Sequence, residues 1–171
     1  MSMIKVPAFI QSDSSRCGPT VIKSILAYYD IEASEDEICR LCGHTFEYGC
    51  DDAGMKAALE HYGLRVAIYN NSNFQQIAYW IKREIPVIVD WFTGGVQPGP
   101  ADLPNGHSSI VVGLDEDKIH LLDPEDGNIR HVVREDFLRC WFDFKGLDAP
   151  CIDSWDQLIL RQIIVPYKVN F

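Results

Sequence analysis

Residues 11–29 read QSDSSRCGPTVIKSILAYY, and this stretch decides how the N-terminal half folds. From Val21 onward, apolar residues recur at a spacing of three and four, which predicts a helix over residues 17–29. Pro19 suits the first turn of that helix, because the N–H that proline lacks has no intrahelical partner there. The sequence therefore predicts that Cys17 lies at the N-terminus of a helix.

Capping residues predict further helices in the first half of the chain. Each begins with a Ser, Asp or Asn that can accept a hydrogen bond from the first turn, and each ends near a Gly or before a Pro. The starts are Ser34, within the capping-box pattern of residues 34–37, the pair Asp51 and Asp52, and Asn73; the expected ends lie near residues 43, 63 and 84.

Short apolar runs separated by turn residues predict strands, mostly in the second half. They span residues 64–69, 86–92, 108–113, 119–123, 129–133 and 158–165, with a short helix at 134–141. Residues 94–106 are rich in Gly and Pro and are expected to form a loop. Helices first and closely spaced strands later predict an α+β fold, and without a repeat or linker we expect a single domain over residues 1–171.

Composition excludes several classes of function. The net charge is −10 and no cluster of Lys and Arg offsets it, which argues against a nucleic-acid partner or an anionic membrane surface. No apolar run approaches the roughly 20 residues that span a bilayer, and the first ten residues do not resemble a signal peptide. We expect a cytoplasmic protein whose six cysteines are free thiols.

Cys17 has the surroundings that a nucleophile needs. The thiolate is the reactive form of cysteine, and the positive end of a helix dipole lowers the pKa of a thiol placed there. Gly18 leaves the backbone beside the sulfur uncrowded. Gln11 lies six residues upstream, so its amide N–H and the backbone N–H of Cys17 are candidate donors to a developing oxyanion.

His107 is the best-placed base among the histidines, because it follows Asn105-Gly106 and opens a predicted strand. The midpoint between His107 and Asp123 is Asp115, inside the turn at residues 113–117. If the two strands pair about that midpoint, His107 and Asp123 lie opposite each other and point to the same face. A carboxylate at that distance would hold the imidazole in one tautomer.

These residues carry a resemblance to a known family. Gln11-x5-Cys17-Gly18-Pro19-Thr20, followed by Gly106-His107 and by Asp123-Pro124 with Gly127, resembles the bacteriocin-processing, double-glycine-leader cysteine peptidases. Residues 25–29 and 137–141 are similar to that family too, and the ordered motifs cover roughly residues 7–142. The resemblance implies a papain-like fold, with an N-terminal helical half packed on a C-terminal antiparallel sheet.

The same resemblance implies roles for particular residues. Cys17 would be the nucleophile, His107 the base, Asp123 its orienting carboxylate and Gln11 the oxyanion-hole residue. Candidate substrate-binding residues are Gly18, Trp91, Gly106 and Ser108, and the loop at 94–106 would border the cleft. Ser108 departs from the aromatic or apolar residue that usually follows the histidine in this family. Many family members are also joined to an ABC exporter, which this chain does not contain.

The chemistry that follows is acyl transfer to a cysteine, with no cofactor and no metal. Three hypotheses remain open: a peptidase, a glutamine deamidase or transglutaminase-type acyltransferase on the same triad, and a non-catalytic peptide-binding module. The partner in each case is a peptide or protein, and the sequence does not identify it. Two metal-like patterns are weaker alternatives: zinc spacing at Cys39, Cys42, His44 and Cys50, and a calcium-like loop at residues 123–128.

Overall fold

The computed structural model describes residues 3–92, 106–144 and 157–169. The helices are α1 (Cys17–Tyr28), α2 (Glu35–Leu41), α3 (Asp52–His61), α4 (Phe74–Ile81) and α5 (Arg134–Cys140). The strands are β1 (Arg65–Tyr69), β2 (Val87–Phe92), β3 (Gly106–Leu114), β4 (Lys118–Leu122), β5 (Ile129–Val133), β6 (Phe142–Phe144), β7 (Leu158–Leu160) and β8 (Ile163–Tyr167). No helix in these ranges is long and apolar enough to cross a membrane.

Side-chain caps start three of the helices where the sequence predicts them. Ser34 accepts a hydrogen bond from the backbone N–H of Glu37, Asp51 from that of Gly54, and Asn73 from that of Gln76. Each cap satisfies an N–H that has no carbonyl partner within its helix. No described side chain caps the start of α1 in this way, so its first N–H groups are available to other acceptors.

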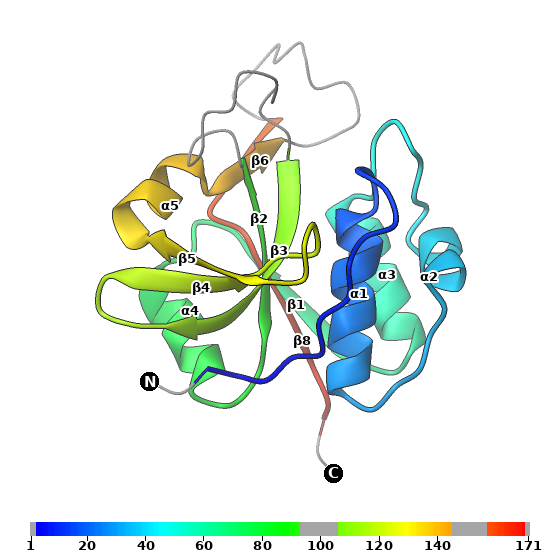
Figure 1. The fold of residues 1–171 in the computed structure, drawn as a ribbon, viewed down its shortest axis with the longest axis horizontal. Coiled ribbons are helices and arrows are strands. Elements are labelled where there is room, and N and C mark those ends of the chain that lie inside the picture. Colours follow the sequence, from blue (N-terminus) through cyan, green and yellow to red (C-terminus); the bar gives the residue numbers. More distant parts are fainter. Residues whose placement is uncertain (1–2, 93–105, 145–156, 170–171) are drawn as a thin grey trace.

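Six strands form one antiparallel sheet in the order β1-β8-β2-β3-β4-β5, and β6 and β7 pair in a second, two-stranded sheet. Figure 1 shows α1, α2 and α3 grouped on one side of the large sheet, with α4 and α5 on the other. The fold is thus the predicted α+β arrangement of a helical N-terminal half packed on an antiparallel sheet.

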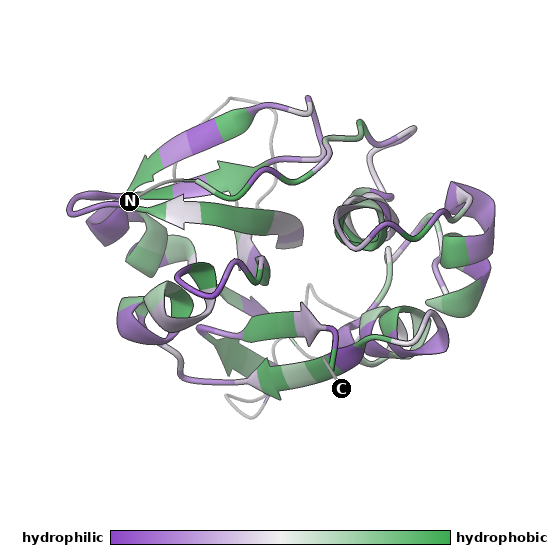
Figure 2. Ribbon diagram, turned by 90° about the horizontal axis from the view of Figure 1, so that it is seen from below, coloured by the Kyte–Doolittle hydropathy of each residue, from purple (hydrophilic) through white to green (hydrophobic). Residues whose placement is uncertain are grey.

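The two faces of the sheet each bury their own apolar core. Ile88 and Ile110 face the helical half and pack with residues of α1 such as Ile22 and Ile25. Val89 and Val111, their neighbours in sequence, point the other way and pack with residues of α4 and α5, as alternation along a strand requires. Figure 2 looks along α1 and shows it enclosed between the sheet and α2. Enclosure of α1 on several sides fixes its N-terminus against the sheet.

Two predicted elements end differently in the structure. The helix expected to reach residue 84 stops at Ile81, because Glu84 adopts a left-handed conformation with φ of 58°. The strand predicted over residues 158–165 is two strands, since Arg161 has φ of 47° and breaks the run. The predicted loop at residues 94–106 lies outside the described residues except for Gly106, which begins β3.

Candidate active site

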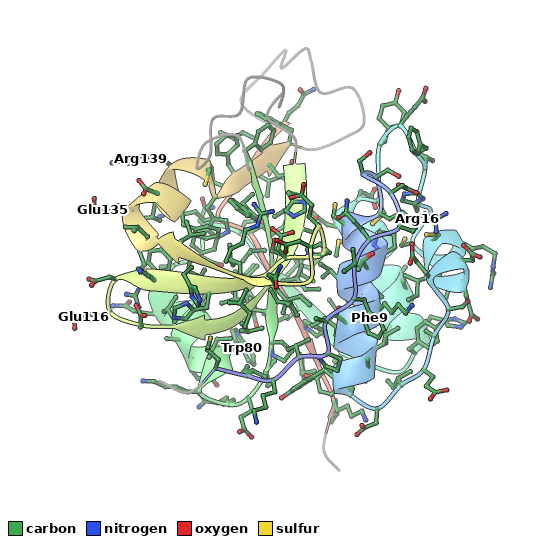
Figure 3. The ribbon with its side chains drawn as sticks, in the orientation of Figure 1. Phe9, Arg16, Trp80, Glu116, Glu135 and Arg139 are labelled. Carbon is green, nitrogen blue, oxygen red and sulfur yellow. The ribbon has the colours of Figure 1, made fainter. Side chains whose placement is uncertain are left out.

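The start of α1 places Cys17 beside the first residues of β3. Arg16, just before it, contacts Glu35 Oε1 at 3.0 Å and Asp36 Oδ1 at 3.3 Å through Nη1. These ion pairs join the start of α1 to the first turn of α2, where Figure 3 shows Arg16. Asp13 adds a third contact, with Oδ2 at 3.0 Å from Arg16 Nε. The segment that leads into Cys17 is therefore held by charge on one side and by the sheet on the other.

His107 and Asp123 are in direct contact. Nε2 of His107 lies 2.8 Å from Oδ1 of Asp123, with the carboxylate fully buried and the imidazole 12% exposed. The Trp91 ring packs against the same imidazole in a T-shaped arrangement, at 6.1 Å between ring centroids. Asp123 and Trp91 thus restrict the orientation of His107 from two directions.

The hairpin that brings these residues together has a different register from the predicted one. Ile110 pairs with Leu122 and Val111 with Leu121, so the same register continued to His107 would set it opposite Glu125. The predicted pairing of His107 directly opposite Asp123 is wrong, and Asp123 is instead its diagonal neighbour. A bulge between Val111 and Gly113 adds a residue to β3 and changes the pairing toward the turn. A shift of two residues keeps both side chains on one face, where a shift of one would separate them.

Cys17 is the second neighbour of the imidazole and is close enough for His107 to lower the pKa of its thiol. Burial is the largest influence on the thiol and raises its pKa, but the hydrogen bond and charge of His107, with the backbone N–H groups of Ser108 and Gly18, bring the net pKa below its ordinary value. Burial also lowers the pKa of His107, yet Asp123 and Cys17 raise it to about 10. Because Asp123 occupies Nε2, the nitrogen left for the thiol is Nδ1. At neutral pH this arrangement favours a thiolate beside an imidazolium.

A backbone hydrogen bond holds Gln11 beside the group formed by Cys17, His107 and Asp123. Its N–H donates to the carbonyl of Pro124 at 2.8 Å, and Pro124 follows Asp123 directly. The side-chain oxygen Oε1 of Gln11 is buried and has no hydrogen-bond partner among the described residues. The segment before α1 is thus attached to the strand end that carries Asp123.

The four candidate substrate-binding residues have distinct surroundings. Gly18 is buried, and a Cβ at this position would overlap Sγ of Cys50. Gly106 is exposed, and a Cβ there would lie 2.8 Å from Oδ1 of Asp143. Ser108 is buried and donates through Oγ to Asp90 at 2.5 Å. Trp91 is only 1% exposed, and its indole N–H donates to Ser109 Oγ at 3.0 Å, so its main contact in the site is with His107.

The sequence patterns did not predict a group of acidic residues near Cys17. Asp90 lies in the apolar run of β2 and is 6% exposed, and burial followed by the charges of Asp52 and Asp143 raises its pKa well above the ordinary value. Burial also raises the pKa of Asp143 to about 6. The signal in the sequence was a lone Asp within a run of five other β2 residues that are all apolar, VIVDWF.

The metal-like patterns form other contacts. Nε2 of His44 lies 3.0 Å from Ser15 Oγ. Residues 123–128 form a turn closed by a hydrogen bond from the Gly127 N–H to the Asp123 carbonyl. Within the described ranges no three His, Cys, Asp or Glu side chains are grouped to hold a metal ion. The cysteines in those ranges, Cys17, Cys39, Cys42, Cys50 and Cys140, are free thiols.

Comparisons with known proteins place the chain in a family. The sequence profile of the Peptidase_C39 like family matches residues 3–149. No curated protein sequence matches the chain.

Solved structures share the fold at low sequence identity. A double glycine motif protease from an AMS/PCAT transporter, in complex with the leader peptide, is 18% identical, with a TM-score of 0.68 over 98% of this chain and 95% of the other. The peptidase domain of Streptococcus ComA, a bi-functional ABC transporter of a quorum sensing pathway, is also 18% identical, with a TM-score of 0.68 over 96% and 100%. A candidate C39-like peptidase from Bacillus anthracis is 15% identical, with a TM-score of 0.73 over the full length of both chains. With a profile match over residues 3–149 and the papain-like fold of these peptidase domains, the chain belongs to the Peptidase_C39 like family.

Proposed function

We propose that this protein hydrolyses peptide bonds, with Cys17 as the nucleophile, His107 as the base and Asp123 as the residue that orients the base. One observation carries the proposal: a single imidazole neighbours the thiol at the start of α1, whose pKa it lowers, and holds a buried carboxylate at 2.8 Å through Nε2. A nucleophile, a base and a third group that orients the base are the parts that covalent catalysis by cysteine requires.

The reaction would begin from the thiolate–imidazolium pair. The Cys17 sulfur attacks the carbonyl carbon of the scissile amide, and the C–O π electrons move onto oxygen. When the tetrahedral intermediate collapses, the C–N bond breaks and His107 gives its proton to the leaving amine. Water then attacks the acyl-enzyme with His107 as base, which releases the acid and restores the thiol.

Donors for the oxyanion are available at the start of α1. No side chain in the described part of the chain caps the helix, and the backbone N–H of Cys17 belongs to its first turn, where helix N–H groups lack carbonyl partners. The Gln11 side chain is the second candidate donor, because its backbone is fixed to Pro124 beside the site. A preorganised donor of this kind contributes about 3 kcal/mol to the stability of the transition state.

Peptides are the proposed substrate class, because a solved relative of this fold is a double glycine motif protease in complex with the leader peptide. The test is incubation of the protein with a diverse peptide library that includes double-glycine sequences, read by mass spectrometry. We expect new peptide termini with the wild type and none with Cys17→Ala. The matched control is Cys39→Ala, which removes a half-buried thiol of α2 and should leave the products unchanged.

The products also separate the alternatives. Released ammonia or a newly formed amide, without a cut backbone, would assign the same residues to a deamidase or an acyltransferase. Identical products from wild type and Cys17→Ala would remove the catalytic function and leave a peptide-binding module.

A further inference from the structure

The two oxygens of the buried Asp123 carboxylate have different partners. Oδ1 accepts from Nε2 of His107 at 2.8 Å and from the backbone N–H of Glu125 at 2.9 Å. Oδ2 faces Nε of Arg130 at 2.7 Å. One oxygen is therefore committed to the candidate base, and the other to a guanidinium.

Arg130 lies between a buried carboxylate and an exposed one. It is in β5, where it pairs with Leu121 of β4, so the sheet register brings it next to the residue that follows this strand. Nη2 lies 2.5 Å from Oε2 of Glu125, and the Arg130 side chain is 29% exposed against 62% for Glu125. The guanidinium thus covers Asp123 on its solvent side.

The contact between Arg130 and Oδ2 is one of charge. The two atoms are close enough for an ion pair, but the Nε–H is not aimed at the oxygen, and Oδ2 has no directed hydrogen bond among the described residues. A buried carboxylate is costly unless nearby charge compensates it. Burial alone would raise the pKa of Asp123; the hydrogen bond and charge of His107, the Glu125 N–H and the charge of Arg130 together lower it below its ordinary value.

We propose that Arg130 is a positioning residue for the reaction: its charge keeps Asp123 ionised, and its contact with Oδ2 keeps Oδ1 turned toward His107. The role rests on the proposed function and acts through Asp123, since no contact joins Arg130 to Cys17 or His107 directly within the described residues. Because charge dominates the contact, a lysine should substitute for Arg130 better than an uncharged residue of similar length.

The decisive variants are Arg130→Gln, which keeps a polar side chain without the charge, and Arg130→Lys, which keeps the charge without the planar guanidinium. The matched control is Arg139→Gln, because the partner of Arg139 among the described residues is Asp136, on the outer side of α5, and its side chain is 70% exposed (Figure 3). Circular dichroism and urea unfolding first establish that each variant is folded at the pH values used.

The kinetic readout is kcat/KM for a cleaved peptide between pH 3.5 and 8. In Arg130→Gln we expect kcat to fall and KM to change little. The acid limb of the kcat/KM profile should move up by about one pH unit or more, because an opposite charge at this distance shifts a carboxyl pKa by that amount. The acid limb of Cys17 alkylation by iodoacetamide should not move up, because the thiolate still faces an imidazolium. Arg130→Lys and Arg139→Gln should keep the wild-type limb. The proposal would be overturned if the acid limb of kcat/KM were unchanged in Arg130→Gln, or if it shifted equally in Arg130→Gln and Arg130→Lys.

A second readout needs no catalytic activity. In protein labelled with nitrogen-15 at histidine, the His107 ring signals, assigned by their loss in His107→Gln, should sense the protonation of Asp123 at low pH. That inflection should appear at higher pH in Arg130→Gln than in the wild type, and an identical inflection would contradict the role of Arg130. If the inflection moves while wild type and Cys17→Ala give the same peptide products, the proposed function fails and the effect of Arg130 on Asp123 stands.

Discussion

Nε2 of His107 lies 2.8 Å from Oδ1 of Asp123 although the two residues are not paired across β3 and β4. Asp123 follows the last residue of β4, and the turn after it supplies a backbone N–H from Glu125 to the same oxygen. The carboxylate is thus held by the turn and presented diagonally to the imidazole. A substitution that removes the charge of Asp123 but keeps an acceptor oxygen can therefore separate the effect of the charge from that of the hydrogen bonds.

Asp123→Asn should reduce kcat/KM by about 100-fold or more, the range over which a positioned acid–base pair contributes to catalysis. The amide has the shape of the carboxylate but no charge, so the pKa of His107 should fall and the thiolate–imidazolium pair should weaken. The measurement is kcat/KM at pH 7 with the peptide found in the library. Asp126→Asn is the control, since an amide oxygen there can still accept from the Asn128 N–H. Equal activities for the two variants would contradict the role of Asp123.

The pKa directions predict the pH profile of Cys17 alkylation. The thiolate should form as pH rises through the lowered pKa of Cys17, and the imidazolium should persist until pH approaches about 10. Iodoacetamide should therefore label Cys17 well below pH 8. Cys39, whose pKa burial raises, should need higher pH in the same sample.

His107→Gln supplies the control for that profile, because it should move the Cys17 profile up toward an ordinary thiol pKa of about 8.5. The labelled residue is identified by peptide mass spectrometry. Parallel profiles for Cys17 and Cys39 in the wild type would show that the thiol is not activated.

Local features of the sequence predicted the starts of the helices well. Ser34, Asp51 and Asn73 each cap a backbone N–H three residues ahead, and such contacts depend only on neighbouring residues. The strand predicted over residues 158–165 was less tractable, because Arg161 breaks it and its two parts join different sheets. β7 pairs with β6, whereas β8 pairs with β1 and β2, which are far away in sequence.

The residues of the candidate site also differ in how readily local sequence patterns predict them. Cys17, His107 and Asp123 could be selected from motifs, since each lies beside a recognisable helix start, strand start or turn. Arg130 and Asp90 could not, because their partners lie across a strand or sheet whose register no local pattern sets. The β3–β4 turn illustrates the difficulty: the pairing of Leu114 with Ile119 centres it between Glu116 and Asp117 rather than on Asp115, and the bulge near Gly113 then shifts the register by one residue.

Gly18→Ala should destabilise the protein, because the new Cβ would overlap Sγ of Cys50. Overpacking of this kind costs about 1–3 kcal/mol. Cys50→Ala removes the obstructing sulfur, so the double variant Gly18→Ala/Cys50→Ala should recover much of the loss. The free energy of unfolding in urea measures the coupling between the two changes.

Cys42→Ala is the matched control for this rescue. Cys42 is close to Cys50 and influences the pKa of that thiol, but its sulfur is not among the atoms that a Cβ at Gly18 would meet. Combined with Gly18→Ala it should therefore not restore stability. Additive losses in both double variants would mean that the sulfur of Cys50 is not the cause of the loss in Gly18→Ala.

Asp143→Asn should change the pH dependence of stability. Burial, with a smaller contribution from the charge of Asp52, raises the pKa of Asp143 from 3.8 to about 6. The folded protein therefore binds more protons than the unfolded chain between these values, and its free energy of unfolding falls as pH rises across that window. The amide cannot ionise, so Asp143→Asn should gain stability over the wild type by up to about 3 kcal/mol between pH 3.5 and 7.5.

Urea unfolding at pH 3.5 and 7.5 measures this gain. Asp115→Asn is the control with the opposite sign, because backbone N–H groups of Lys118 and Asp117 lower the pKa of Asp115 and its charge supports the folded state above that pKa. Relative to the wild type, Asp115→Asn should therefore lose stability as pH rises while Asp143→Asn gains it. If the free energies of unfolding of Asp143→Asn and the wild type differed by the same amount at both pH values, Asp143 would ionise without hindrance in the folded protein. The acidic group near Cys17 would then carry more charge at neutral pH than the burial of its members implies.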